Sequence, residues 1–231
     1  MDDSSACVRR TPFARRGILV AALAVFAVAP AALHADAFQL GMTMSTSPVS
    51  NTLMSEASMS SSPADSVDLA PLREIYLASV RDGSAIARGL GEIERIRVRA
   101  RPEAGSPLEA TLTAYQGALV TLRAKHAAWP PQKLRYMREG LALLDRTVEL
   151  NPGHAEVRYL RLMSCYYLPG LFGRGGSVRE DFAALARLLP GVRGQYPPAV
   201  YAAIARFVVE KGRLPAEQRR VLEGTLATPD A

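Results

Sequence analysis

The sequence predicts an all-α fold: about eight helices in stacked antiparallel hairpins, with no sheet. Three observations support this. Apolar residues between positions 67 and 228 recur with the 3.6-residue period of a helix, and no stretch alternates with the two-residue period of a strand. Short turns rich in proline, glycine and asparagine separate the periodic segments, which favours antiparallel neighbours. Residues 67–228 are numerous enough to form one helical-hairpin domain with a sizeable core.

The first 37 residues have the features of an export signal. Four arginines precede the apolar run Ile18–Leu33, and small residues after it allow cleavage following Ala35 or Ala37. The run is short for a membrane-spanning helix, which needs about 20 residues. We therefore expect a Sec-type signal peptide, removed from a periplasmic or secreted protein. The alternative is a retained N-terminal membrane anchor.

Residues 38–66 differ in composition from the rest of the chain. They are rich in Ser, Thr and Met and show no sustained period, which predicts a disordered linker. A second interpretation is copper handling, because thioether sulfur is a soft ligand for Cu(I). Neither His nor Cys reinforces the methionines, and this favours the linker. The methionines concerned are Met42, Met44, Met54 and Met59. At the other end of the chain, residues 229–231 are expected to form a short tail.

Charge and cysteine content exclude several classes of protein. Removal of residues 1–37 takes away four of 28 basic and three of 22 acidic residues, which leaves an excess of only +5. The Lys and Arg residues form no run, so nucleic-acid binding is not expected. Cys165 would be the only cysteine left, so no internal disulfide is available. His126 and His154 belong to no cluster with ligand spacing, and neither a metal nor another cofactor is predicted.

The first half of the domain contains three predicted helices. Leu69–Arg81 and Ser84–Ile96 are separated by an Asp-Gly turn. A capping box, Ser106-Pro107-Leu108-Glu109, begins the third helix with proline at its first position. Trp129-Pro130-Pro131 is expected to end this helix, because consecutive prolines cannot continue the hydrogen-bond ladder.

The next two helices are expected to form the centre of the fold. Lys133–Leu150 is amphipathic, with Gly140 on its apolar side, where the absence of a side chain lets a neighbouring helix come close. Ala155–Leu168 is apolar almost all round, which is typical of a central helix. Its narrow polar arc contains Arg158 and Arg161. Buried arginines need an acidic partner, a carbonyl partner or a ligand.

The segment LPGLFGRGGSVRED, Leu168–Asp181, has glycine spacing close to that of a phosphate-binding loop. Such a loop follows a strand and carries a lysine where this chain has Gly176. Ser177 and Glu180 instead predict a capping box, with two carboxylates in the first helical turn that would repel a phosphate. Nucleotide binding is therefore not expected. The remaining predicted helices are Ser177–Leu189, Pro198–Lys211 and Pro215–Leu226.

Residues 137–167 resemble part of a tetratricopeptide (TPR) repeat. The stretch GLALLDRTVELNP matches the second helix of such a unit, with small Gly140, apolar Leu144 and Pro152 closing it. No 34-residue self-similarity recurs along the chain, so the resemblance implies an irregular TPR-like stack.

A wider pattern consists of Tyr115–Ala118, Ala124–His126, Lys133, Glu156–Arg158, Arg161 and Asp181. It is similar to that of a group of exported bacterial proteins of unassigned function. This resemblance implies the same TPR-like helical fold and no particular activity.

Six residues of this pattern are candidates for ligand or partner binding. His126 either caps helix carbonyls or titrates at the mouth of a pocket. Arg158 and Arg161 either pair with carboxylates such as Glu139, Glu156 or Asp181, or clamp an anionic ligand. We hypothesise that these two arginines meet Lys125 and His126 in space. Tyr166 and Tyr167 are expected in the core. The six candidates are Lys125, His126, Lys133, Arg158, Arg161 and Asp181.

These observations favour an exported interaction module that holds a protein or peptide of the cell envelope. The membrane would be contacted only through an uncleaved signal segment. One alternative is a small-molecule binder or enzyme that uses the Lys/His/Arg group, although no nucleophile–base–orienter set is visible. The other is copper handling through the linker methionines.

Overall fold

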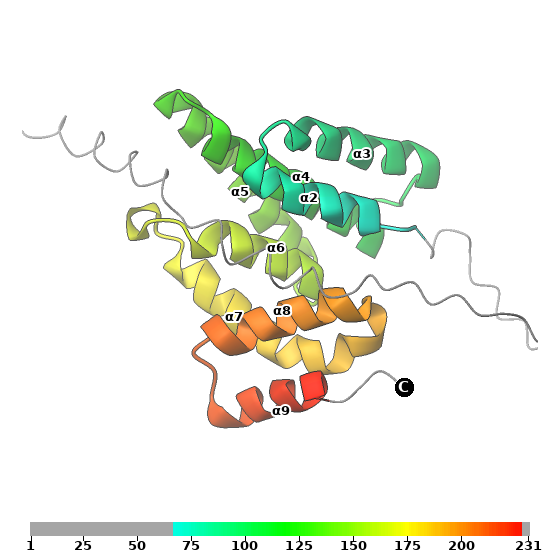
Figure 1. Ribbon diagram of the computed structural model, residues 1–231, viewed down its shortest axis with the longest axis vertical. Coiled ribbons are helices and arrows are strands. Elements are labelled where there is room, and N and C mark those ends of the chain that lie inside the picture. Colours follow the sequence, from blue (N-terminus) through cyan, green and yellow to red (C-terminus); the bar gives the residue numbers. More distant parts are fainter. Residues whose placement is uncertain (1–66, 228–231) are drawn as a thin grey trace, which may run out of the picture.

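The computed structural model describes residues 67–227, and this part of the chain is all-α, as predicted (Figure 1). It contains eight α-helices, two short 3₁₀ helices and no strand. The signal, linker and tail predicted for residues 1–37, 38–66 and 229–231 lie outside the described residues. The α-helices are α2 (Ala70–Arg81), α3 (Ala85–Ala100), α4 (Pro107–His126), α5 (Pro130–Leu150), α6 (Ala155–Tyr166), α7 (Gly175–Val192), α8 (Pro198–Lys211) and α9 (Ala216–Ala227), and the 3₁₀ helices are η3 (Gly170–Phe172) and η4 (Arg193–Gln195).

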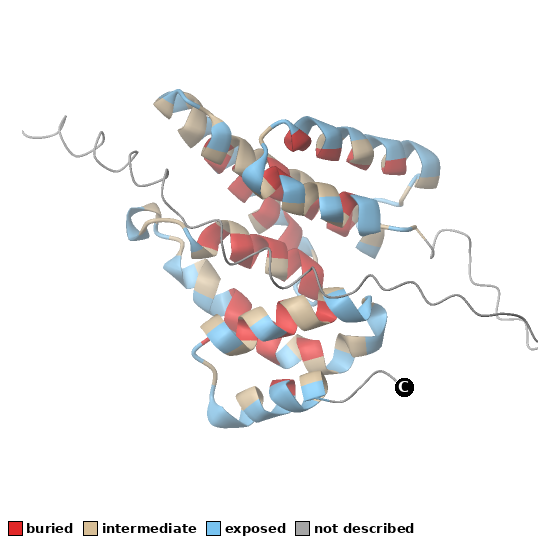
Figure 2. Ribbon diagram, viewed as in Figure 1, coloured by how far each residue is buried: buried red, intermediate tan, exposed pale blue. Residues whose placement is uncertain are grey.

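Helix α6 lies at the centre of the described residues and joins two hydrophobic clusters. Val157 and Leu160 belong to the first cluster, with side chains from α2 to α5. Ala155 and Leu162 belong to the second, with side chains from α7, α8 and α9. Nine of the 12 residues of α6 are buried. Most of this helix is accordingly red in Figure 2. The predicted central helix is confirmed, and the sizeable core is divided into two clusters that share it.

Helices α4 and α5 form the closest helix pair. A Cβ atom on Gly140 would lie 2.5 Å from the carbonyl oxygen of Gly117 and 2.6 Å from the amide nitrogen of Thr121. Real Cβ atoms do not approach other heavy atoms so closely, so only glycine allows this contact. The predicted role of Gly140 is confirmed.

The predicted boundary at Trp129-Pro130-Pro131 is wrong. Helix α4 ends three residues earlier, at His126, and the two prolines form the first turn of α5. The first amide groups of a helix have no intrahelical acceptor, so proline loses no hydrogen bond there. Lys133 consequently lies within α5 rather than at its start.

The predicted capping box at Ser177 is also wrong. Helix α7 begins at Gly175, after an Arg174 cap residue whose side chain makes no capping hydrogen bond. Glu180 and Asp181 therefore fall in the second turn, from where they reach α6. The Glu180 carboxylate bonds to Arg158 and Arg161, so it does not return to the Ser177 amide as a capping box requires.

Two other local predictions agree with the structure. The Ser106 side chain accepts a hydrogen bond from the Glu109 amide at 3.3 Å, which confirms the first capping box. The glycine-rich segment is a bend that follows a helix, not a strand. Gly173 has a φ of 68°, a left-handed conformation that favours glycine.

The remaining boundaries differ little from those predicted. Helix α3 continues to Ala100 instead of ending at Ile96, and α6 ends at Tyr166 instead of Leu168. The bounds of α2, α8 and α9 agree to within one residue. Between residues 67 and 227, no helix combines the length and the apolar character needed to cross a bilayer.

Replacing Gly140 with alanine should destabilise the fold by about 1–3 kcal/mol, because the new methyl group overpacks the α4–α5 contact. Gly91→Ala is the matched control. Gly91 lies within α3 and nothing surrounds its Cβ position, so alanine should add about 0.5–1 kcal/mol of stability there. Urea unfolding of both variants tests the contrast, and a stabilised Gly140→Ala protein would contradict the close packing.

Candidate functional site

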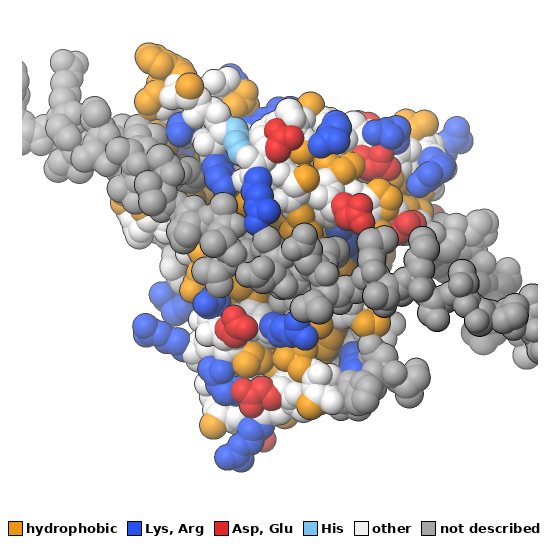
Figure 3. All heavy atoms as spheres, in the orientation of Figure 1, with side chains coloured by type: hydrophobic (Ala, Val, Ile, Leu, Met, Phe, Trp, Pro, Cys, Tyr) orange, Lys and Arg blue, Asp and Glu red, His pale blue; other side chains and the backbone are white. Residues whose placement is uncertain are grey.

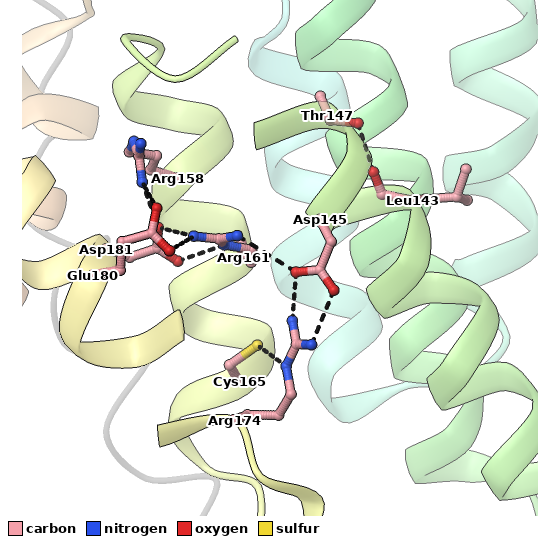
Figure 4. Close-up of polar contacts among 9 residues, drawn as sticks. All are labelled: Leu143, Asp145, Thr147, Arg158, Arg161, Cys165, Arg174, Glu180 and Asp181. Carbon is pink, nitrogen blue, oxygen red and sulfur yellow. Dashed lines mark hydrogen bonds and ion pairs between the residues drawn. The ribbon is translucent and has the colours of Figure 1, made fainter. Parts of the chain in front are cut away.

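Two arginines of α6 meet a fully buried carboxylate of α7 (Figure 4). Asp181 accepts hydrogen bonds from Arg158 Nη1 at 3.0 Å, from Arg161 Nε at 2.8 Å and from Arg161 Nη2 at 2.7 Å. Glu180 accepts from both guanidinium groups at 3.1 Å. The predicted pairing with Asp181 is therefore confirmed. The predicted alternatives are not used: Glu139 lies 3.7 Å from Arg135 on the surface, and Glu156 bonds to other residues.

The network extends to α5 and to the bend before α7. Arg161 Nη1 lies 3.5 Å from Asp145, and Arg174 Nη1 donates to the same carboxylate at 2.9 Å. Arg174 Nε also donates to the Sγ atom of Cys165 at 3.3 Å, while burial raises the pKa of that thiol. We call Asp145, Arg158, Arg161, Arg174, Glu180 and Asp181 the arginine–carboxylate cluster.

The arginine–carboxylate cluster contains three positive and three negative side chains, so its net charge is zero. Each guanidinium already faces at least one carboxylate. An anionic ligand would have to displace these internal partners and leave a buried carboxylate unpaired, which is costly. The cluster therefore serves to join α5, α6 and α7, and an anion clamp is not favoured.

Lys125 and His126 belong to the last turn of α4, and their side chains reach the C-terminal end of α2. Lys125 Nζ donates to the Val80 carbonyl at 2.7 Å, and His126 Nε2 lies 2.9 Å from the Ser79 carbonyl. A carbonyl oxygen only accepts, so Nε2 of His126 carries a hydrogen. Both side chains satisfy late carbonyl groups of a helix, which lack intrahelical donors. The prediction that His126 caps helix carbonyls is confirmed, although the helix is α2 rather than its own.

The six predicted residues thus fall into separate places. Arg158, Arg161 and Asp181 come together, whereas Lys125 and His126 bond to α2. No interaction among the described residues joins these two groups. Lys133 is half-buried in α5, and its ammonium makes no hydrogen bond or ion pair within residues 67–227.

A second buried polar group occupies the start of α6. The Glu156 carboxylate accepts two hydrogen bonds from Arg73 at 2.9 Å and one from the Tyr115 hydroxyl at 2.7 Å. The Glu156 amide donates to the Tyr196 hydroxyl at 3.3 Å. These bonds join α2, α4 and the segment before α8 to α6.

Aromatic side chains continue from this point along one side of α6. Tyr159 and Tyr166 follow Glu156 at helical spacing, and Phe207 of α8 lies 6.0 Å from the first ring and 5.3 Å from the second. Tyr76 of α2 lies on the other side, in edge contact with Tyr115. Figure 1 shows α6 between α2 and α8 in this region. We call Tyr76, Tyr159, Tyr166, Tyr196 and Phe207 the aromatic face.

Two hydroxyl groups of the aromatic face have no internal partner. Neither Tyr76 nor Tyr159 donates or accepts a hydrogen bond through its hydroxyl within residues 67–227. Burial nevertheless raises the pKa of Tyr76 to about 12 and raises that of Tyr159 above its usual range. Both side chains are only half-buried, so their hydroxyls can take part in a contact with a ligand.

The aromatic face was not predicted from the sequence, where Tyr166 and Tyr167 were expected in the core. Tyr166 is half-buried among aromatic rings, but Tyr167 is 46% exposed, so the prediction for Tyr167 is wrong. The spacing of Tyr159 and Tyr166 was a usable signal, because residues seven apart share one side of a helix.

No group of three or more His, Cys, Asp or Glu side chains between residues 67 and 227 could hold a metal ion. Comparison of the chain with protein-family models, curated proteins and solved structures found no match. The described part of the chain therefore defines an all-α protein. Its central helix, α6, bears the arginine–carboxylate cluster, which has no net charge, on one side and the aromatic face on another.

Replacing Asp181 with asparagine should lower the free energy of unfolding by roughly 3–5 kcal/mol, because two buried guanidinium groups lose their common carboxylate. Glu180→Gln is the matched control. It removes a neighbouring charge from the same arginines, but the Glu180 side chain is 56% exposed, so the loss should stay below about 1 kcal/mol. Equal losses in the two variants, measured by urea unfolding, would contradict the central place given to Asp181.

Tyr76 should make stability depend on alkaline pH. Its pKa is about 12 in the folded protein and 10.0 in the reference state, so the neutral folded form is favoured below pH 10. This contribution is lost as the pH rises from 10 to 12, by up to about 1.4 kcal/mol per pH unit. Urea unfolding between pH 9 and 12 should show a shallower decline for Tyr76→Phe than for the unmodified protein. Parallel declines would be evidence against a buried Tyr76 hydroxyl.

Proposed function

We propose that this protein is an exported, TPR-like helical protein that acts as an interaction module in the cell envelope. It holds an extended segment of a partner protein or peptide against the aromatic face. The observation that supports this most directly is the pair of unpartnered hydroxyls, Tyr76 and Tyr159, set among aromatic rings between α2 and α8.

The chemistry of the aromatic face suits a polypeptide. Tyrosine rings offer a large contact area and lose little conformational freedom on binding, and their hydroxyls can donate to or accept from a peptide backbone. The rings are held in place before any partner arrives, because Glu156 fixes α2 against α6 through Arg73. Such preorganisation lowers the free-energy cost of binding.

Other surfaces offer less support for binding. Lys125 and His126 already bond to α2 carbonyls, and Arg158 and Arg161 already bond to carboxylates, so a Lys/His/Arg pocket for a small molecule is not favoured. Lys and Arg side chains are interspersed with Asp and Glu on the face in Figure 3, unlike the continuous basic stripe of a nucleic-acid-binding surface. The four methionines of the copper interpretation lie outside the described residues.

The proposal can be tested by photo-crosslinking in the cells that make the protein. A benzophenone amino acid at position 159 should capture a partner polypeptide, whereas the same amino acid at position 142 should not, because Ala142 is an exposed residue of α5, a helix that contributes no residue to the aromatic face. Tyr159→Ala should then reduce recovery of that partner at least about tenfold, as expected for a central aromatic contact.

Tyr136→Ala is the matched control for Tyr159→Ala. Tyr136 is a half-buried tyrosine of α5, where Arg123 and Arg135 lie over its ring, and its loss should change recovery less than about twofold. Tyr159→Phe should give an intermediate effect, because it removes only the hydroxyl. Unchanged recovery with folded Tyr159→Ala protein would rule out binding at the aromatic face.

A further inference from the structure

The aromatic face has a possible occupant within the same chain. We propose that residues 38–66 dock on it and compete with the partner, so that the protein is autoinhibited until the partner displaces them. This inference rests on the proposed function, since it concerns regulation of the same face.

The described chain begins beside the aromatic face. Val67 and Leu69 pack against the first hydrophobic cluster, and the Asp68 side chain accepts a hydrogen bond from the Ala70 amide at 2.9 Å. These contacts fix the start of α2, the helix that also carries Arg73 and Tyr76. Residue 66 is therefore attached within about two helical turns of the Arg73–Glu156 pair.

The preceding segment is long enough to cover the face. Helix α6 has 12 residues, so it is about 18 Å long at 1.5 Å per residue. An extended chain rises about 3.3 Å per residue, so about six residues would follow the whole of α6. The 29 residues of the segment 38–66 provide that stretch and leave ample chain for the connection to Val67.

The composition of the segment suits an aromatic surface. It holds four methionines, whose thioethers make favourable contacts with aromatic rings. Its many Ser and Thr residues and its backbone supply donors and acceptors for the hydroxyls of Tyr76 and Tyr159. Its charged residues are two acids, Glu56 and Asp65, whereas residues 67–227 hold 24 basic and 16 acidic side chains. Charge therefore favours the contact.

The covalent connection makes even a weak contact effective. A short flexible connection gives an effective concentration on the order of millimolar, so an intramolecular site with a dissociation constant near 0.1 mM would be mostly occupied. An outside partner would have to bind more tightly than that to displace the segment. Occupation would also shield the aromatic rings from nonspecific contacts.

Crosslinking within the purified protein tests this inference. The full-length gene is expressed, and the protein is purified after any processing by the cell. One variant carries the benzophenone amino acid at position 159, and a second variant carries it at position 207. Equal amounts of ¹⁴N- and ¹⁵N-labelled protein are mixed before irradiation. We expect crosslinks from both positions to residues 38–66 of the same chain, with a yield that stays constant over about 100-fold dilution. Position 142 should give none.

Crosslinks between labelled and unlabelled chains would overturn the inference in favour of a second copy as occupant. Absence of crosslinks to residues 38–66 from both positions in folded protein would also overturn it. Deletion of residues 38–66 should raise partner capture at position 159 in cells several-fold, and unchanged capture would contradict autoinhibition. The proposed function would instead be refuted if position 159 captured no partner in cells, with or without residues 38–66, while the undeleted protein still formed the intrachain crosslinks.

Discussion

The contact between Asp181 and the two arginines of α6 is the constraint on which the rest of the structure depends. A fully buried carboxylate facing two guanidinium groups tolerates little displacement, because any separation leaves buried charge unpaired. It fixes α7 against α6, and α7 supplies much of the second hydrophobic cluster. Together with the apolar contacts of the second hydrophobic cluster, this contact positions the second half of the described chain against α6.

Glu156 has the corresponding role toward the first half. It binds Arg73 of α2 and Tyr115 of α4 from the first turn of α6, while Arg158 and Arg161 face α7 from another side of the same helix. A helix that is apolar on its remaining sides could otherwise pack in several rotations. Charges on two of its sides, each with a partner on a different helix, leave one rotation. That rotation directs Tyr159 and Tyr166 toward Phe207 of α8.

Much of the fold was predictable because its signals are local. The helical period and the Ser106 capping box involve residues within one or two turns of each other. The place of Gly140 on the apolar side of its own helix is also a local signal, although the residues that it contacts lie on α4. Features set by distant partners were not predictable from one sequence. The Glu180 carboxylate pairs with Arg161, 19 residues earlier, rather than with a local capping box. The aromatic face unites side chains from α2, α6 and α8, and periodicity alone does not show which helices are neighbours.

The two sides of α6 differ in how fully their polar groups are satisfied, and this difference bears on function. In the arginine–carboxylate cluster every charge has an internal partner, so the cluster stabilises the architecture and has little to offer a ligand. On the aromatic face, Tyr76 and Tyr159 keep half-buried hydroxyls that make no hydrogen bond to the described residues. The same central helix therefore provides both the rigid frame and the unsatisfied surface that binding requires.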